Sequence, residues 1–528
     1  MSPIAVLFLL VLGGVLLVPV AERLRLPAPI LTTGLGLALA LIPGVPDVTL
    51  SPELILPVVL PPLLYAAARR SSWRQFAANL KPILLLAVVL VFVTTTVVTI
   101  VAATIHPALP IGAALVLGAI VSPPDAAAVT TVAGRLGLPR RLVTILEGEG
   151  LFNDVVALTL YQVAVAGVVT GSLSPLGSLG SFAYSGIVAV AIGFAVGFVS
   201  KVLLDRIADS RLTTALSLLV PYIAYVPADD LHASGVLAVL ATAFYLGARS
   251  MDPDDIEGRL VRGSFWDVTE LMVTAVTFGI IGLELVAVIG DFNGRVTGLA
   301  LYSGLIAGTV ILARAVWMLL AMWVTRWRLS WTGSPIGWRA TVVVAWCGMR
   351  GVVTTVTALA LPFTTRAGDP FPGREQIQLV SMAVVVATLM LQGLSLPWLI
   401  GRLGLRADAT REAAANRKVV ECARQAATRR LEELAGTGRV PTEFVERMHS
   451  WYDMVSAAEL DPSNIDSDSD AARLLAKRTK IRKLENEMLA AARAALVEAR
   501  TQPGYDPAAV DSVLQSLDMR SQSLSSAG

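Results

Sequence analysis

Runs of apolar residues, each long enough to cross a lipid bilayer, constrain the fold of this 528-residue chain more than any other feature. A membrane-spanning helix needs about 20 mostly apolar residues, within a range near 17–25. Thirteen segments meet this requirement, at residues 3–20, 28–45, 52–68, 82–105, 108–132, 143–170, 182–204, 212–227, 232–249, 265–290, 297–323, 338–362 and 376–401. We therefore expect an all-α membrane protein with about 13 transmembrane helices. The count falls to twelve if the short segment 212–227 is re-entrant.

The composition agrees with this interpretation. Of all residues, 55% are hydrophobic and 16% are charged, against roughly 45–50% and about 25% in soluble domains. The net charge of +2 gives no reason to expect nucleic acid as a partner. Two isolated cysteines, Cys347 and Cys422, indicate neither a disulfide framework nor a zinc cluster.

Charge is concentrated near the C-terminus, where residues 407–528 hold 36 charged residues in 122 positions, nearly three times the density of the preceding part. We expect a transmembrane domain over residues 1–405 and a helical tail over residues 406–528. The tail helices are predicted at 408–435, 441–460 and 470–501. The run 461–470 is rich in turn-forming residues and reads as a linker.

The positive charges of the loops indicate the orientation of the chain. Every second loop, counted from the one after the first apolar segment, carries Lys or Arg, eighteen in total. The loops between them carry only Arg295, Arg366 and Arg374. Cytoplasmic loops hold an excess of Lys and Arg, so we expect the N-terminus outside and the tail in the cytoplasm. No Lys or Arg precedes the first segment and no cleavage signal follows it, so we expect a retained helix and not a signal peptide.

Four places inside the apolar segments carry ionisable or helix-breaking residues, and a charge at the membrane centre costs about 2.5–3.5 kcal/mol. In the fifth segment, Ser122-Pro123-Pro124-Asp125 must interrupt the helix, because consecutive prolines remove two backbone donors and clash with the preceding turn. We interpret it as a discontinuous helix at a transport site, where Asp125 balances the positive end of a half-helix. A structural kink with a capping Asp125 is the simpler alternative.

The sixth segment contains Glu147-Gly148-Glu149-Gly150-Leu151-Phe152-Asn153-Asp154, which places three carboxylates and one amide within eight residues. Glu147 and Asp154 are seven residues apart, and Glu149 and Asn153 are four apart, so each pair shares a helix face. These side chains cannot all face lipid. We expect a cation- and proton-binding cluster; interfacial acids with one hydrogen-bonded aspartate are the alternative.

The twelfth segment contains Cys347-Gly348-Met349-Arg350-Gly351, in which two glycines flank a buried cation that needs a carboxylate. The fifth and twelfth segments occupy corresponding places in two six-helix halves joined by one linker helix. Paired interruptions of this kind indicate a transport site at the membrane midplane. The fourth place is Glu284, which we expect to be interfacial, and we expect His106 and His232 at the surface.

Together these segments resemble the bacterial sodium/proton antiporters of the monovalent cation:proton antiporter-1 family over roughly residues 1–405. The resemblance rests on LPPLLYAAARRSSW at 60–73, VSPPDAAAV at 121–129, LEGEGLFNDVVAL at 146–158, WCGMRGVVTTVTALALP at 346–362 and LQGLSLP at 391–397. It implies two inverted six-helix repeats with crossed discontinuous helices, and a core bundle that moves against a dimerisation domain in a homodimer.

The resemblance also implies the roles of single residues. Asp154 is the carboxylate that binds sodium and a proton in competition, Asn153 positions it, and Asp125 lies between the crossed broken helices. Pro124 offers a backbone carbonyl where many relatives place Thr. Glu149 and Arg350 match a buried ion pair that holds the core bundle together. No cofactor is implied besides the transported Na⁺ and H⁺.

Two further positions depart from the family pattern. Gly150 stands where relatives with a mapped site place Ser, and Ala66 stands where some place an acid. At these positions the chain lacks the serine oxygen and the carboxylate that those relatives carry.

These roles predict exchange of one sodium ion for one proton by alternating access across the cytoplasmic membrane, which is electroneutral if Asp154 carries all the exchanged charge. Potassium or broad alkali-cation exchange stays open, because nothing in the sequence separates these cations. A passive channel is one alternative from another class. A membrane-embedded aspartyl protease is a second, but it needs two aspartates that share a proton, in a Gly-x-Gly-Asp setting that neither Asp125 nor Asp154 has.

Overall fold

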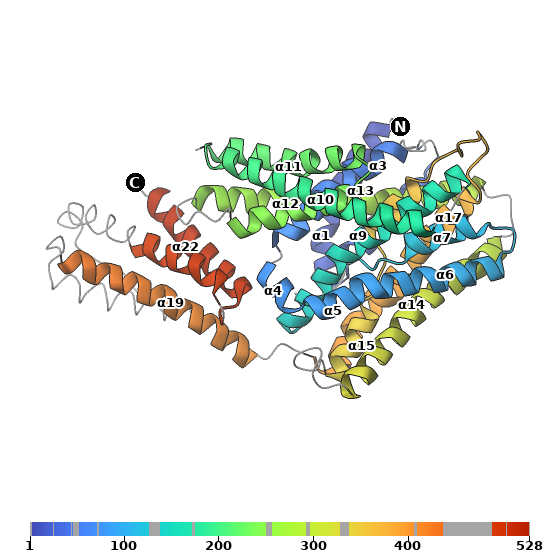
Figure 1. Ribbon diagram of the computed structural model, residues 1–528. Coiled ribbons are helices and arrows are strands. Elements are labelled where there is room, and N and C mark those ends of the chain that lie inside the picture. The colour runs from blue at the N-terminus through green and yellow to red at the C-terminus, as the bar shows by residue number, and fades with distance from the viewer. Residues whose placement is uncertain are drawn as a thin grey trace. The chain divides into compact units, whose positions relative to one another are not determined.

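The computed structural model is helical in nearly all the residues that it describes (Figure 1). These residues are 3–24, 26–43, 45, 52–70, 73–125, 138–171, 175–207, 209–249, 256–291, 296–327, 337–405, 409–436, 488–502 and 504–526. Within them, the only β-type pairing is an isolated antiparallel bridge between Thr364 and Pro370. The all-α fold class predicted from the sequence is therefore confirmed for this part of the chain.

The described helices, in chain order, have the following bounds. They are α1 (Pro3–Leu24), α2 (Ala28–Ala40), α3 (Pro52–Arg70), α4 (Trp73–Ala78), α5 (Leu80–Leu84), the π-helical turn η1 (Leu85–Val89), α6 (Leu90–Ile105), α7 (Ile111–Val121), α9 (Arg140–Thr170), α10 (Pro175–Leu204), α11 (Ser210–Asp230), α12 (Gly235–Arg249), α13 (Ile256–Asp291), α14 (Val296–Trp327), α15 (Trp338–Trp346), α16 (Val352–Leu359), α17 (Arg374–Thr388), the π-helical turn η2 (Leu389–Gly393), α18 (Leu394–Leu403), α19 (Ala409–Gly436) and α22 (Pro507–Ser526). A further helix covers residues 488–501.

The chain divides into two compact units. Unit 1 comprises Met1–Arg206, Ala215–Ala248 and Phe265–Ala407. Unit 2 comprises Ile207–Thr214, Arg249–Ser264 and Asp408–Gly528.

Eight helices in the described ranges are long and apolar enough to cross a membrane, and four shorter apolar helices accompany them. Each of the thirteen segments predicted from the sequence overlaps at least one helix. The segment 212–227, short in the sequence, lies within α11, which has 21 residues. The structure therefore places a helix wherever the sequence predicted an apolar span.

Two of the predicted spans are interrupted. The helix α7 ends at Val121, and residues 122–125, which include the Pro123-Pro124 pair, are not helical; residues 126–132 of this span lie outside the described residues. The twelfth span consists of the nine-residue α15 and the eight-residue α16, separated by the non-helical residues 347–351. Both interruptions lie where the sequence predicted them, at consecutive prolines and at a Gly-x-x-Gly run.

The helix α9 carries the predicted cluster from Glu147 to Asp154. It begins after Pro139, whose fixed backbone suits a helix start. It runs for 31 residues and ends at Gly171, which adopts a left-handed conformation with φ 71°. Glu149, Asn153 and Asp154 therefore lie on one continuous helix.

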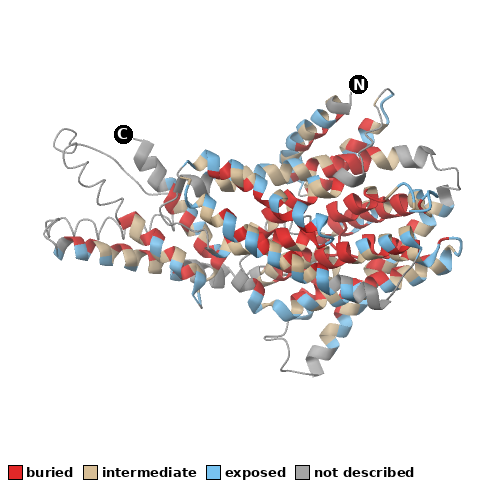
Figure 2. Ribbon diagram, turned by 45° about the horizontal axis from the view of Figure 1, so that its top comes forward, coloured by how far each residue is buried: buried red, intermediate tan, exposed pale blue. Residues whose placement is uncertain are grey.

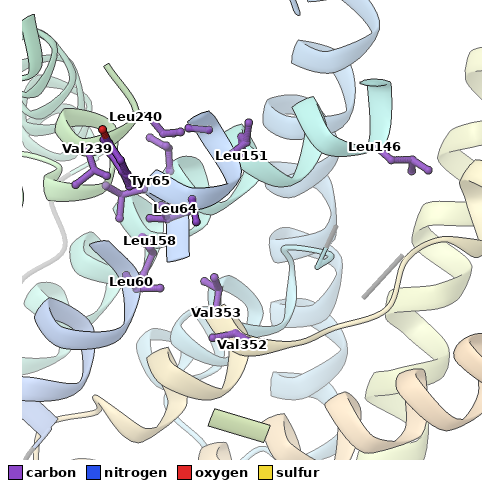
Figure 3. Close-up of a cluster of buried hydrophobic side chains, with 14 of the residues drawn as sticks. Leu60, Leu64, Tyr65, Leu146, Leu151, Leu158, Val239, Leu240, Val352 and Val353 are labelled. Atoms are coloured by element: carbon purple, nitrogen blue, oxygen red, sulfur yellow. The ribbon is translucent and has the colours of Figure 1, made fainter. Parts of the chain in front are cut away.

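A shared apolar core fixes α16 relative to α9. The core of unit 1 contains side chains from α3, α9, α12 and α16. Figure 3 labels some of them, namely Leu60, Leu64, Tyr65, Leu146, Leu151, Leu158, Val239, Leu240, Val352 and Val353. Buried positions line the inner faces of the helices, and exposed positions lie on the outer faces (Figure 2). The start of α16 is thus packed into the core to which α9 also contributes.

Unit 2 has an apolar core of its own in the tail. Buried side chains recur every four residues along α19, at Val419, Ala423, Ala427 and Leu431, and α22 and the helix at 488–501 pack on them. The predicted helix at 408–435 is confirmed by α19, and the one at 470–501 is described from residue 488 onward. The helix predicted at 441–460 and the linker 461–470 lie outside the described residues. The helix α22 was missed, although apolar residues at Val510, Leu514 and Leu517 already have helical spacing.

Candidate functional site

The two helix interruptions meet inside unit 1. The backbone N–H of Asp125 donates to the carbonyl of Met349, with 2.6 Å between nitrogen and oxygen. The Asp125 carboxylate accepts from the N–H of Val352, the first residue of α16, with 3.1 Å from Oδ2 to N. Asp125 therefore caps the N-terminal end of α16, where the helix dipole favours negative charge.

Arg350 caps the end of α7. The contact between the end of α7 and the start of α16, formed by Asp125 and Arg350, is called the crossing below. Its Nε donates to the carbonyl of Val121 at 2.8 Å, and its Nη2 donates to the carbonyl of Ser122 at 2.9 Å. These carbonyls belong to the last residue of α7 and to the residue after it, so they have no partner within that helix. Nη1 also donates to the carbonyl of Gly348. A cation here interacts favourably with the negative end of the α7 dipole.

The two glycines of the interruption make room for these contacts. A Cβ atom at Gly351 would overlap the Asp125 carboxylate. A Cβ atom at Gly348 would lie 2.7 Å from Cδ of Arg314, closer than real Cβ contacts allow. The sequence therefore needs glycine on both sides of Arg350 because charged side chains approach the backbone there.

Asn153 joins α9 to the crossing. Its Nδ2 donates to the carbonyl of Pro124 at 2.9 Å. The side chain is fully buried, and its Oδ1 has no hydrogen-bond partner among the residues that the structure describes. A buried acceptor without a donor costs about 1–3 kcal/mol, so Oδ1 is available to a cation or to water.

Asp154, the next residue of α9, is partly buried. It forms no hydrogen bond or ion pair with another residue in the described ranges, and its charge lies close enough to that of Asp125 for the two to repel each other. Neutralising either carboxylate removes this repulsion. The structure thus brings Asp125, Pro124, Asn153 and Asp154 together.

The partner predicted for Glu149 was wrong. Glu149 and Arg314 of α14 form a bidentate ion pair, in which Nη2 lies 2.8 Å from Oε2 and Nη1 donates to Oε1. Arg350 forms no ion pair with a described residue; the carbonyls of the broken helices satisfy its guanidinium instead. The physical reason is that the carbonyls at the end of α7 have no partner within their helix, and the Arg350 guanidinium donates to them.

Arg314 was missed by the sequence-based prediction. Its Nε and Nη2 also donate to the carbonyl of Val344, at 3.1 and 3.0 Å, in the last turn of α15. Arg314 therefore caps the end of α15 much as Arg350 caps the end of α7. The signal was available, because Arg314 is a charge in the middle of the apolar segment 297–323.

The remaining predicted positions contribute less. Gly150 is buried in α9, and Ala66 packs in the apolar core, so neither offers a side-chain oxygen. Glu284 is partly buried and interacts electrostatically with Arg374. His232 is exposed as predicted, whereas His106 is partly buried beside Tyr302, with ring centroids 6.1 Å apart.

The arrangement has the chemistry of a site for a hard cation. Such cations take oxygen ligands, preferably from carboxylates, amides and backbone carbonyls. All three kinds occur here, in Asp154, Asn153 and Pro124. No group of three or more His, Cys, Asp or Glu side chains is placed to hold a metal ion in the described part of the chain, so a bound cation would depend on amide and carbonyl oxygens.

Several known proteins are similar in sequence to this chain. The family model for transmembrane sodium/hydrogen exchangers matches residues 7–402. An uncharacterised Na⁺/H⁺ exchanger of Mycobacterium tuberculosis is 34% identical over 406 residues, which are 75% of this chain and 73% of that protein. A Bacillus pumilus protein named as a sodium, potassium, lithium and rubidium/H⁺ antiporter is 29% identical over 399 residues, which are 71% of this chain and 58% of that protein.

A solved structure has the same fold. It is the sodium proton antiporter MjNhaP1 from Methanocaldococcus jannaschii at pH 8, with a TM-score of 0.61 and 21% sequence identity. The match covers 76% of this chain and 98% of that chain. The tail beyond residue 402 lies outside the family match.

The buried ion pair gives a prediction about stability. Replacing Arg314 by Met leaves the Glu149 carboxylate buried without a partner, so we expect the free energy of unfolding to fall by about 3–5 kcal/mol. The matched control is Lys201→Met, which breaks the exposed pair with Asp205 and costs about 0–1 kcal/mol. Thermal unfolding in detergent measures both. Equal midpoints for Arg314→Met and the wild type would contradict the role given to this pair.

The close approach at Gly351 gives a second prediction. Gly351→Ala places a Cβ atom on the Asp125 carboxylate and separates the two half-helices, with an expected loss of about 1–3 kcal/mol in stability. Gly304→Ala on α14 is the control, because nothing lies within 4 Å of a Cβ atom at that position. Unfolding midpoints of the two variants give the comparison, and a Gly351→Ala protein as stable as Gly304→Ala would be inconsistent with the crossing.

Proposed function

Because this chain belongs to the sodium/hydrogen exchanger family, we propose that it exchanges sodium ions for protons by alternating access. It is a multi-pass antiporter of monovalent cations and protons in the bacterial cell membrane. Its family and fold are those of secondary transporters, so it is not an enzyme, and the aspartyl protease alternative is excluded. Sodium and protons are cargo, and the proposal includes no cofactor.

The proposed cation site is centred on Asp154. The observation that supports it best is the buried Oδ1 of Asn153, which has no partner in the described ranges and belongs to the residue next to Asp154. The Nδ2 of the same amide is held by the Pro124 carbonyl, which fixes the direction in which Oδ1 points. Asp154, Asn153 and Pro124 would supply oxygens to sodium, and Asp125 would add negative charge beside them.

Competition at one carboxylate couples the two ions. A proton and a sodium ion both neutralise Asp154, and only one of them can occupy it. A core carrying a neutralised Asp154 crosses the apolar part of the membrane more readily than one carrying a bare charge. The easier crossing of the neutralised core is therefore sufficient to couple sodium transport to proton transport. Because one sodium ion replaces one proton, the proposed exchange moves no net charge.

The wider architecture is part of the proposal. We propose thirteen transmembrane helices in two inverted six-helix repeats, with the N-terminus outside and the tail in the cytoplasm. The transmembrane antiporter domain would cover residues 1–405 and the tail residues 406–528. The pair of interrupted spans, one in each half, supports the repeat. A homodimer is proposed by analogy with the family.

Broad alkali-cation exchange is the second candidate. The Bacillus pumilus relative bears a name that includes potassium, lithium and rubidium. Gly150 and Ala66 offer no side-chain oxygen, and a site built from fewer fixed ligands discriminates less sharply between cations of different size.

The proton carrier is tested by Asp154→Asn. This variant keeps the size of the side chain but cannot exchange a proton, so we expect exchange to fall to the level of empty vesicles, with normal insertion and folding. Asp205→Asn, at an exposed carboxylate at the end of α10, is the control and should exchange like the wild type. A pH-sensitive dye in proteoliposomes reports both. Sodium-driven proton flux in Asp154→Asn would remove Asp154 from the mechanism.

The transported cation and the charge balance are tested in the same vesicles. Sodium, lithium and potassium are added in turn at a fixed pH, and the proposal predicts a stronger response to sodium than to potassium. Equal responses would select broad alkali-cation exchange. An imposed membrane potential should leave the rate unchanged, whereas a strongly voltage-dependent rate would contradict the one-for-one stoichiometry.

A further inference from the structure

One buried face of α17 and η2 carries a row of polar side chains that the proposed site does not use. They are Gln378, Ser381, Thr388 and Gln392, all at most 5% exposed. Their spacing of three, seven and four residues places them on the same side of the helix. Buried polar groups at membrane depth are costly and are retained for a purpose.

Thr388 holds the interruption of the twelfth span. Its Oγ1 accepts the backbone N–H of Arg350, with 3.1 Å between the two atoms. The same hydroxyl donates to the carbonyl of Val384, one turn earlier in α17, at 2.8 Å. The hydroxyl therefore has its proton committed to its own helix and its lone pair directed at Arg350. This geometry fixes the backbone of Arg350, which lies two positions before the first residue of α16.

Gln378 holds the opposite end of the same half-helix. Its Nε2 donates to the carbonyl of Ala358 at 3.2 Å. Ala358 lies in the last turn of α16, where carbonyls have no partner within the helix. Two side chains ten residues apart on α17 thus hold α16 just before its first residue and in its last turn.

The half-helix α16 needs such support because it has only eight residues. Isolated helices shorter than about 12–15 residues are marginal by themselves. Its first N–H groups must also be aimed accurately, because Val352 donates to Asp125 and the Arg350 guanidinium reaches the end of α7. A displacement of the Arg350 backbone would change both caps together. Asn153 would be affected too, since it binds the Pro124 carbonyl next to Asp125.

We propose that α17 positions α16 through Thr388 and Gln378, and that Thr388 is a positioning residue for the cation site formed by Asp154, Asn153 and Pro124. This inference rests on the proposed function. Thr388 acts through the Arg350 backbone and does not itself contact the cation.

The test compares Thr388→Val with Thr388→Ser in proteoliposomes. Valine keeps the shape but removes the acceptor for the Arg350 N–H, and serine keeps the acceptor. The half-saturating sodium concentration at a fixed pH should rise about three- to tenfold in Thr388→Val and stay near the wild-type value in Thr388→Ser. Thr277→Val on α13 is the control, because among the described residues the Thr277 hydroxyl bonds to its own helix, at the carbonyl of Val273. It should behave like the wild type.

The readout separates positioning from simple loss of stability. A purely structural effect would reduce the amount of folded protein or the maximal rate and leave the half-saturating concentration unchanged. Gln378→Met is a second variant, which removes the contact at the other end of α16 and should raise the same concentration about twofold or more. Unchanged half-saturation in both Thr388→Val and Gln378→Met would overturn the inference. Exchange by the wild type in the same vesicles tests the proposed function separately.

Discussion

Two interrupted helices leave backbone N–H and C=O groups without hydrogen-bond partners in their own helices, at membrane depth. The packing of unit 1 must satisfy these groups. The structure satisfies them by reciprocal capping. Arg350, from the interruption between α15 and α16, binds the carbonyls at the end of α7, and Asp125, from the interruption after α7, binds the first N–H of α16. A direct backbone hydrogen bond from Asp125 to Met349 joins the two. Each interruption therefore supplies the hydrogen-bond partners that the other one needs.

Buried charge is arranged around this crossing in two different ways. Arg314 and Glu149 neutralise each other as a bidentate pair, and Arg314 also caps α15. Arg350 depends on helix carbonyls. Asp154 has neither kind of support within the described residues. Within the described residues, the Asp154 carboxylate has no hydrogen-bond or ion-pair partner, and the neighbouring Asn153 amide oxygen has none either. Such a pair of groups is suited to bind an ion reversibly. This contrast supports the proposal that Asp154 binds the exchanged ions and that the other buried charges have structural roles.

Sequence patterns predicted the structural features that are determined within a single segment, such as helix interruptions and helix faces. Consecutive prolines located the end of α7, the glycines around Arg350 located the other interruption, and helical spacing placed Glu149 and Asn153 on one helix. Pairing between distant segments was not predictable in the same way. Glu149 and Arg314 are 165 positions apart, and spacing along a helix does not say which neighbouring helix a side chain meets. Arg314 was overlooked because the apolar residues around it dominate its segment. The support that α17 gives to α16 also became visible only from the contacts, since threonine and glutamine in a helix carry no strong signal.

In the proposed mechanism one carboxylate, Asp154, holds either a sodium ion or a proton. The most direct measurement is proton release when sodium is added to the purified protein in weakly buffered detergent solution, at a pH where the site is protonated. We expect release of about one proton for each sodium ion bound, saturating with the same sodium dependence as binding itself. Sodium binding without proton release, or release of two protons for each sodium ion, would contradict it.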